Sequence, residues 1–249
     1  MHYFMKPKRS VPPKQKRTSK KWTGTTPNIE IVYEDNHLLI IDKPAGLLSQ
    51  ADKTNNVDLT ELCKQYLKKA YNKPGNVYLG LTHRLDRPVS GLMVLTKTSK
   101  AASRISQLIR EQQLKKTYWA IVHGRTPEEA TYEHFLKKDS KTNKTKAFGS
   151  KKSGAKPAVL SYTTLKQSAH YSLIEIDLVT GKPHQIRVQL SKMGFPLWGD
   201  YKYGEEETGP GKSLALRAYA LAFEHPVKKE SMNIKAHIPR QQPWNLFDY

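Results

Sequence analysis

The sequence predicts an α+β fold in which helices flank a mixed, largely antiparallel central sheet. Segments rich in β-branched and aromatic residues outnumber segments whose apolar residues recur with a helical period. Many of these predicted strands are close neighbours along the chain, as strands joined by hairpins are. The 249 residues, 37% of them hydrophobic, suffice for one large domain or for two small ones.

Residues 1–28 are predicted to form a basic, disordered tail, and residues 29–249 the folded domain. The tail has few apolar residues and four prolines, at positions 7, 12, 13 and 27. Its lack of acidic residues suits an organellar targeting sequence, but the prolines argue against the amphipathic helix that such a sequence needs. We expect a cytoplasmic location, with organellar or nuclear targeting by the tail as the alternative.

The first half of the folded domain is predicted to contain strands at residues 29–33, 37–41, 77–81 and 92–96. A helix is predicted from Asp58, which can cap it together with Glu61, to about residue 71. Its apolar stripe includes Cys63, which is therefore expected in the core. A second helix is predicted from about residue 99 to 113, with a buried face formed by Ala101, Ala102, Ile105, Leu108 and Ile109.

The second half is predicted to contain strands at residues 116–124, 132–136, 158–165, 171–179, 214–216, 218–223 and 234–238. Between the fourth and fifth of these, a turn leads into a helix with Pro183 in its first turn, where proline is tolerated. Gly194 is predicted to end this helix. Its expected buried stripe consists of Ile186, Leu190 and Met193.

Positive charge is concentrated in two segments of the chain. Residues 1–29 carry eight Lys and Arg and no acid, and residues 137–156 carry eight lysines against one acid, Asp139. Together they supply 15 of the 20 excess positive charges. The second segment lies between two predicted strands, so we expect it to be an arm, or insertion, beside the sheet. Two such segments suggest RNA or another phosphate-rich partner, and solubilising segments are the alternative.

Several classes of protein are not indicated by the composition. No apolar run approaches 18 residues, so no membrane span is predicted. The single cysteine excludes an internal disulfide. The nine histidines show no spacing typical of metal ligands, so we expect neither a metal nor a cofactor.

One short segment concentrates charge in a predicted loop. Residues 83–91 read HRLDRPVSG and place one carboxylate, Asp86, between Arg84 and Arg87. Predicted strands flank the segment, and Pro88 and Gly91 interrupt it, so Asp86 is expected in a loop held by a sheet. Taken alone, these residues favour an ordinary surface ion pair, which contributes only about 0–1 kcal/mol to stability.

The whole string nevertheless resembles the catalytic motif of the RluA-type pseudouridine synthases. Four further blocks resemble the same family in the same chain order: KPAGL at 43–47, KTYWA at 116–120, TGKPHQIRV at 180–188 with its continuation to Gly204, and residues 214–226. Together they cover roughly residues 29–238. The resemblance implies the pseudouridine synthase fold and an isomerase that converts a uridine of structured rRNA or tRNA to pseudouridine.

The resemblance also implies a role for four residues. Asp86 is the catalytic nucleophile, and Arg187 is the cation that keeps its carboxylate charged in a buried pocket. Tyr118 packs against the target base and assists proton removal. Arg84 fills the space left by the flipped uridine or holds a phosphate. An ordinary strand aromatic and an exposed helical arginine are the alternatives for Tyr118 and Arg187.

The chain departs from the family pattern in two respects. Pro183, Gln189 and Arg217 stand where relatives often have threonine, histidine and histidine, which bears on RNA preference more than on chemistry. Many relatives also carry an N-terminal S4-type RNA-binding domain, and the 42 residues before Lys43 are too few for one. We therefore expect a stand-alone catalytic domain, active as a monomer, whose basic segments replace the affinity of that domain.

Two other classes of function compete with this interpretation. A non-catalytic RNA-binding or assembly protein could have kept the fold, but it would not need Asp86, Tyr118 and Arg187 together. A nuclease or another hydrolase would require paired metal-binding carboxylates or histidines, which the sequence does not show.

Overall fold

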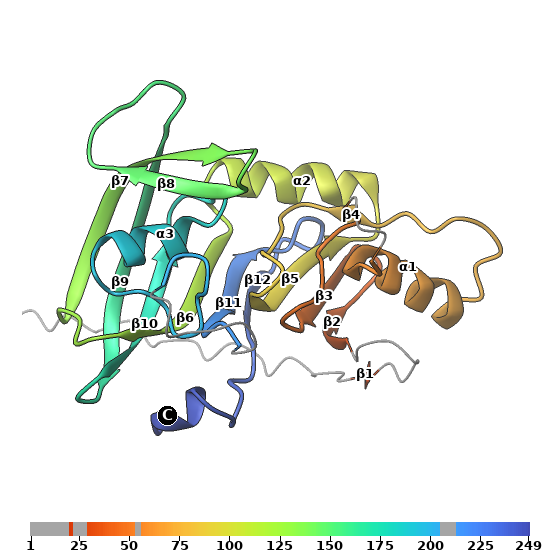
Figure 1. The fold of residues 1–249 in the computed structure, drawn as a ribbon. Coiled ribbons are helices and arrows are strands. Elements are labelled where there is room, and N and C mark those ends of the chain that lie inside the picture. Colours follow the sequence, from red (N-terminus) through yellow and green to blue (C-terminus); the bar gives the residue numbers. More distant parts are fainter. Residues whose placement is uncertain (1–19, 22–28, 53–55, 205–212) are drawn as a thin grey trace, which may run out of the picture.

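The computed structural model describes residues 20–21, 29–52, 56–204 and 213–249. Within these residues, twelve strands form one sheet in the order β1-β2-β3-β5-β11-β6-β10-β9-β7-β8, with β4 on β5 and β12 on β11 (Figure 1). The strands are β1 Lys20–Lys21, β2 Glu30–Glu34, β3 Leu38–Lys43, β4 Gly80–Leu81, β5 Ser90–Thr96, β6 Lys115–His123, β7 Glu129–Asp139, β8 Lys144–Phe148, β9 Lys156–Gln167, β10 Tyr171–Leu178, β11 Leu216–Glu224 and β12 Ser231–Lys235.

Among the described strands, only β5 and β11 pair in parallel; every other pairing is antiparallel. The α-helices in the described residues are α1 Leu59–Ala70, α2 Ser99–Arg110 and α3 Gln185–Lys192, and a short 3₁₀ helix covers Trp244–Leu246. The predicted α+β fold with a mixed, largely antiparallel sheet is confirmed. None of these helices is long and apolar enough to cross a membrane.

The central strands are continuously apolar because both faces of the sheet are covered. In β3, Leu39 and Ile41 belong to the core cluster that includes the buried residues of α1, whereas Leu38 and Ile40 belong to the cluster that includes Ile105 of α2. Successive side chains of a strand point to opposite faces. Helices α1 and α2 therefore stabilise opposite faces of the same strands.

The first two helices follow the prediction closely. Asp58 caps α1 by accepting a hydrogen bond from the backbone N–H of Glu61, and Cys63 is buried, as expected. The predicted strand at residues 77–81 is reduced to Gly80–Leu81. These two residues pair with Thr96 and Leu95 at the end of β5, so the residues before them have no strand to pair with. Val77 and Leu79 are buried in the core without joining the ladder.

The third helix differs from its prediction at both ends. It starts at Gln185, because His184 occupies the N-cap position with a left-handed backbone (φ 56°), and Pro183 precedes the helix. Met193 caps the C-terminus and is exposed instead of completing a buried stripe. Gly194, with φ 85°, turns the chain away from the helix as predicted.

The lysine-rich residues 137–156 contribute the end of β7, all of β8 and the first residue of β9 to the sheet, with loops at 140–143 and 149–155, which corrects the expectation of an arm beside the sheet. Strands β7 and β8 form a hairpin at the sheet edge, and β8 packs against α3. Leu136 and Thr145 are buried there, while the lysines of the hairpin are exposed. Burial alternates only in part of the hairpin, up to Leu136 in β7 and around Thr145 in β8, and the consecutive residues 137–139 are all exposed.

Towards the C-terminus, the two predicted strands 214–216 and 218–223 are one strand, β11, and the last strand begins three residues before its predicted start and ends at Lys235. The predicted disordered tail, residues 1–28, lies outside the described residues except for Lys20–Lys21, which pair with β2 as β1.

Candidate active site

Asp86 lies in the loop between β4 and β5, and the loop is fixed at both ends. Leu85 and Val89 are buried on either side of it, and the N–H of Val89 donates to the carbonyl oxygen of Asp86 at 3.0 Å. This turn leaves the carboxylate pointing out of the core. At the end of the loop, Gly91 has φ 116°, and a Cβ there would collide with the backbone of Ala218, so only glycine lets β5 approach β11.

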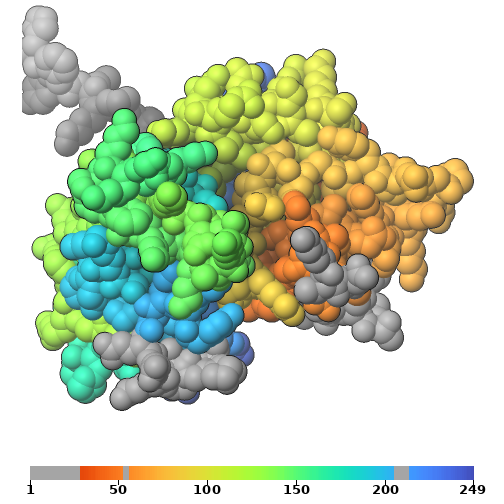
Figure 2. Space-filling model, turned by 45° about the horizontal axis from the view of Figure 1, so that its top comes forward, coloured from red at the N-terminus to blue at the C-terminus, as the bar shows by residue number. Residues whose placement is uncertain are grey.

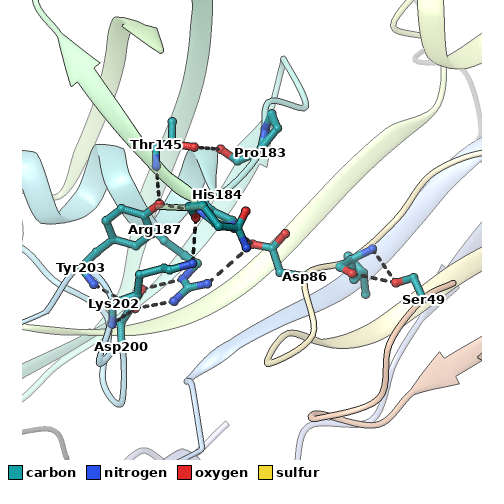
Figure 3. A network of polar contacts seen from close by, with 11 residues as sticks. Ser49, Asp86, Thr145, Pro183, His184, Arg187, Asp200, Lys202 and Tyr203 are labelled. Atoms are coloured by element: carbon teal, nitrogen blue, oxygen red, sulfur yellow. Dashed lines mark hydrogen bonds and ion pairs between the residues drawn. The ribbon is translucent and has the colours of Figure 1, made fainter. Parts of the chain in front are cut away.

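Two polar side chains hold the same loop, Ser49 from another segment and His83 from the loop itself. Ser49 Oγ donates to the carbonyl of Leu85 (2.7 Å) and accepts from its N–H (3.2 Å), as Figure 3 shows. His83 Nε2 accepts from the N–H of Val94 at 3.0 Å and anchors the loop to β5. Burial lowers the pKa of His83 to about 3, with the nearby charge of Lys116 as a smaller cause, so the ring stays neutral and can accept.

Lys43 joins the KPAGL segment to the Asp86 loop from a fully buried position. Its amino group donates to the carbonyl oxygens of Pro44, Leu47 and Arg87 at 3.0, 2.8 and 3.2 Å. Burial lowers the pKa of Lys43 to about 8, although the charge of Asp86 acts in the opposite direction. The sequence motif includes Lys43, but nothing in the motif assigned it this bracing role.

Arg187 of α3 is placed between two carboxylates. Its Nε and Nη2 donate to Asp200 at 2.7 and 2.6 Å, and its Nη1 lies 3.7 Å from Asp86 Oδ2 (Figure 3). Burial acts to lower the pKa of Arg187, but the hydrogen bonds and charge of Asp200 and the charge of Asp86 raise it overall. The guanidinium is thus a fixed cation. Asp200 is a site residue that sequence reasoning missed.

Tyr118 of β6 forms part of the wall beside Asp86. Its side chain is almost completely buried, and it lines the same cavity as the aspartate. Burial raises the pKa of the phenol well above its usual value, and the negative charge of Asp86 raises it further. The hydroxyl therefore keeps its proton at any physiological pH.

The cavity that contains Asp86 has a volume of about 580 Å³. The loop 82–89, strand β6 and the start of α3 line it, together with Lys138 of the lysine-rich hairpin. Figure 2 shows the surface hollowed between the green hairpin residues and the yellow residues opposite them. Arg84 is exposed and also lines this cavity. All four site residues predicted from the sequence, Asp86, Arg84, Tyr118 and Arg187, therefore surround one cavity.

Two further side chains on the α3 side of the cavity had no predicted role. His184 Nδ1 lies 2.5 Å from the hydroxyl of Tyr203, and its Nε2 lies 3.9 Å from Asp86 Oδ2. The Tyr203 hydroxyl accepts a hydrogen bond from the N–H of Thr145 in β8 at 2.8 Å. Only the position of both residues within a family-like block could have drawn attention to them.

The three departures from the family pattern lie in different environments. Gln189 is completely buried and donates to the carbonyl oxygens of Tyr132 and Ala158, which ties α3 to the sheet. Arg217 is also buried. Of the three, only Pro183 lines the cavity.

Comparison with known proteins agrees with this picture. Residues 37–192 match the model of a family described as RNA pseudouridylate synthase. Human RNA Pseudouridylate Synthase Domain Containing 4 has a similar structure, with a TM-score of 0.70 and 26% identity over 84% of this chain and 88% of that one. The chain belongs to the RNA pseudouridylate synthase family, as its motifs predicted.

Two curated relatives are similar to this chain in sequence. Ribosomal large subunit pseudouridine synthase D of Neisseria meningitidis serogroup A is 34% identical, covering 85% of this chain and 58% of the relative. tRNA pseudouridine synthase C of Pectobacterium carotovorum is 30% identical, covering 87% of this chain and 60% of the relative. The chain thus spans less than two thirds of the length of either relative.

Proposed function

We propose that this protein is an RNA pseudouridine synthase that isomerises a uridine of structured rRNA or tRNA, with Asp86 as nucleophile. The observation that carries the proposal is the environment of Asp86. Its Oδ2 lies 3.7 Å from Nη1 of the buried Arg187, and Asp86 is part of the lining of the cavity. The carboxylate is thus placed beside a fixed cation and is accessible to a substrate in the cavity.

The reaction breaks the N1–C1′ bond, turns the uracil and joins its C5 to C1′. C5 loses its hydrogen as a proton, and N1 ends with a proton, so no oxidant or reductant is needed. The carboxylate forms a transient bond to either C6 of the base or C1′ of the ribose. In both cases negative charge on Asp86 changes during the reaction, and the fixed charge of Arg187 stabilises the carboxylate form.

Tyr118 and Arg84 act on the substrate from different positions. Because the phenol of Tyr118 keeps its proton, we assign to it packing against the uracil and hydrogen bonding, and not the role of a phenolate base. Arg84, exposed at the cavity and two residues from Asp86, is suited to replace the flipped uridine or to contact a phosphate.

The proposed partner is RNA, bound largely through its phosphates. Lys138 and Lys182 line the cavity, and the exposed lysines of the β7–β8 hairpin surround it on one side. Such cationic groups bind nucleic acid by releasing counterions, so the affinity should fall steeply with salt. We further propose that residues 29–249 act as one catalytic domain in a monomer.

The test is tritium release from [5-³H]uridine-labelled rRNA and tRNA, because isomerisation must expel the C5 hydrogen. We expect release by the wild type and background release by Asp86→Asn, with RNA binding unchanged. Asp177→Asn is a matched control, because Asp177 is an exposed carboxylate of β10 outside the Asp86 cavity, and it should behave as the wild type.

Release by Asp86→Asn at the wild-type rate would refute the role of Asp86. RNA binding without release by the wild type, on every RNA tried, would instead indicate a binding protein that retains the fold.

A further inference from the structure

His184 lies between Asp86 and Tyr203, and each of these residues faces one nitrogen of its ring (Figure 3). Its Nδ1 is 2.5 Å from the Tyr203 hydroxyl, and its Nε2 is 3.9 Å from Asp86 Oδ2. The backbone holds it there in the left-handed region, at φ 56°. This conformation is uncommon for a non-glycine residue, although His adopts it more readily than most.

The hydrogen-bond partners determine which ring nitrogen carries the proton. The Tyr203 hydroxyl accepts from the N–H of Thr145, and its own proton has an acceptor when His184 Nδ1 is unprotonated. On the other side, the carboxylate of Asp86 can only accept. Both neighbours therefore favour a proton on Nε2, with the N–H aimed at Asp86.

A second proton on this ring is disfavoured by its surroundings. Burial lowers the pKa of His184, the charge of Asp86 raises it, and the charges of Arg187, Lys202 and Lys138 lower it further. These groups come from the loop of Asp86, from α3, from the segment after α3 and from β7. The ring is therefore neutral near pH 7.

We propose that His184 is a positioning residue for Asp86, held in the Nε2–H tautomer by Tyr203 so that it and Arg187 both hold Oδ2 and turn Oδ1 towards the substrate. This proposal rests on the proposed function. The separation of 3.9 Å closes by a small rotation or through one water, as such contacts do when a substrate binds. Thr145 extends the chain of contacts to the lysine-rich hairpin.

Two substitutions separate the role of Nε2–H from the role of the backbone. The amide nitrogen of glutamine reaches the position of Nε2, whereas that of asparagine reaches only the position of Nδ1. We expect His184→Gln to stay within about threefold of the wild-type kcat and His184→Asn to lose at least about tenfold, the effect of one hydrogen bond to a charged group. KM for RNA should not change, because neither change removes a phosphate contact.

The strain of the backbone predicts the opposite order, which makes the comparison decisive. Asparagine adopts the left-handed conformation more readily than glutamine does. If His184 matters only for folding, His184→Asn should therefore be the more active and the more stable variant. That result, or equal kcat for both variants, would overturn the proposal.

The tautomer itself can be measured without RNA, by ¹H–¹⁵N NMR of histidine-labelled full-length protein. We expect the wild type to show His184 protonated at Nε2 alone, and Tyr203→Phe to show a mixture of tautomers and the kcat loss of His184→Asn. Protonation at Nδ1 in the wild type would refute the inference. Absence of tritium release by the wild type would refute the proposed function and leave the NMR result standing.

Discussion

Two buried arginine–aspartate pairs occur on opposite faces of the same sheet, and only one of them faces the cavity. Arg187 pairs with Asp200 beside Asp86, whereas Arg217 of β11 pairs with Asp42 of β3. Leu216, next to Arg217 in the strand, lines the cavity, so Arg217 itself points to the other side. Ion-pair chemistry alone therefore does not identify a functional site.

The difference lies in how each guanidinium is used. Arg187 donates hydrogen bonds from Nε and Nη2 to Asp200, and its Nη1 faces the carboxylate of Asp86. Arg217 donates to Asp42 and to Ser90 Oγ, and its Nε has no partner among the described residues. One pair holds a third charge at an open cavity, while the other connects strands β3, β5 and β11 in the interior.

The largest expected effect comes from removing each arginine in turn. Arg187→Met should lower kcat by about 10²–10³-fold, the effect of removing one fixed donor from a developing charge. Arg217→Met should leave the kcat of the folded protein close to that of the wild type. Single-turnover tritium release with excess enzyme measures both. Equal losses in the two variants would abolish the functional distinction between the pairs.

The sequence indicated the residues of the site more readily than the contacts that hold them. Asp86, Arg84, Tyr118 and Arg187 were predictable because the family resemblance implies a role for each. Lys43 and Asp200 also lie in family-like blocks, but their contacts were not predictable. Asp200 meets Arg187 only because the chain turns back after α3, and the three acceptors of Lys43 are backbone carbonyls, which every residue has.

The fold was predictable where periodicity reflects burial and not where it depends on neighbours. Residues 77–81 alternate like a strand, yet only Gly80 and Leu81 have a partner strand beside them. Strand β7 was predicted at residues 132–136, whereas the edge strand β8 has too few apolar residues to be recognised in the sequence. Tertiary contacts determine whether such segments form strands.

The next largest effect concerns the stability contributed by each of the two pairs. Removing one partner of a buried pair leaves an uncompensated charge and costs about 3–5 kcal/mol, whereas replacing both partners by apolar residues is often close to neutral. We expect Arg217→Met to be strongly destabilising and Asp42→Leu with Arg217→Met to recover most of the loss, as measured by urea unfolding.

The corresponding double variant, Arg187→Met with Asp200→Leu, should recover only part of the stability, because Asp200 also accepts from the backbone N–H groups of Lys202 and Tyr203, and it should recover no activity. Recovery of tritium release in this variant would show that the third charge contact to Asp86 is dispensable. A double variant at Asp42 and Arg217 as unstable as the single one would mean that the interior pair contributes by more than charge compensation.

The smallest expected effect is a pH dependence of folding stability that arises from the Arg217–Asp42 pair. Burial raises the pKa of Asp42, and the charge of Arg217 lowers it by less, so the pKa remains above its usual value in the folded protein. A carboxyl whose pKa is raised by folding binds its proton more tightly in the folded state. Its contribution thus favours folding at low pH and is lost as the pH rises through the folded pKa.

Loss of Arg217 removes the cation that opposes burial, so the pKa of Asp42 should rise further in Arg217→Met. The destabilisation by Arg217→Met should therefore be smaller near pH 4.5 than at pH 7, because Asp42 can then take up a proton in the folded state. Urea unfolding of both proteins across this range measures the difference. The Asp42→Leu, Arg217→Met variant should lack this pH dependence, because the titrating carboxyl is gone. A destabilisation of Arg217→Met that does not depend on pH would show that Asp42 stays charged without its partner.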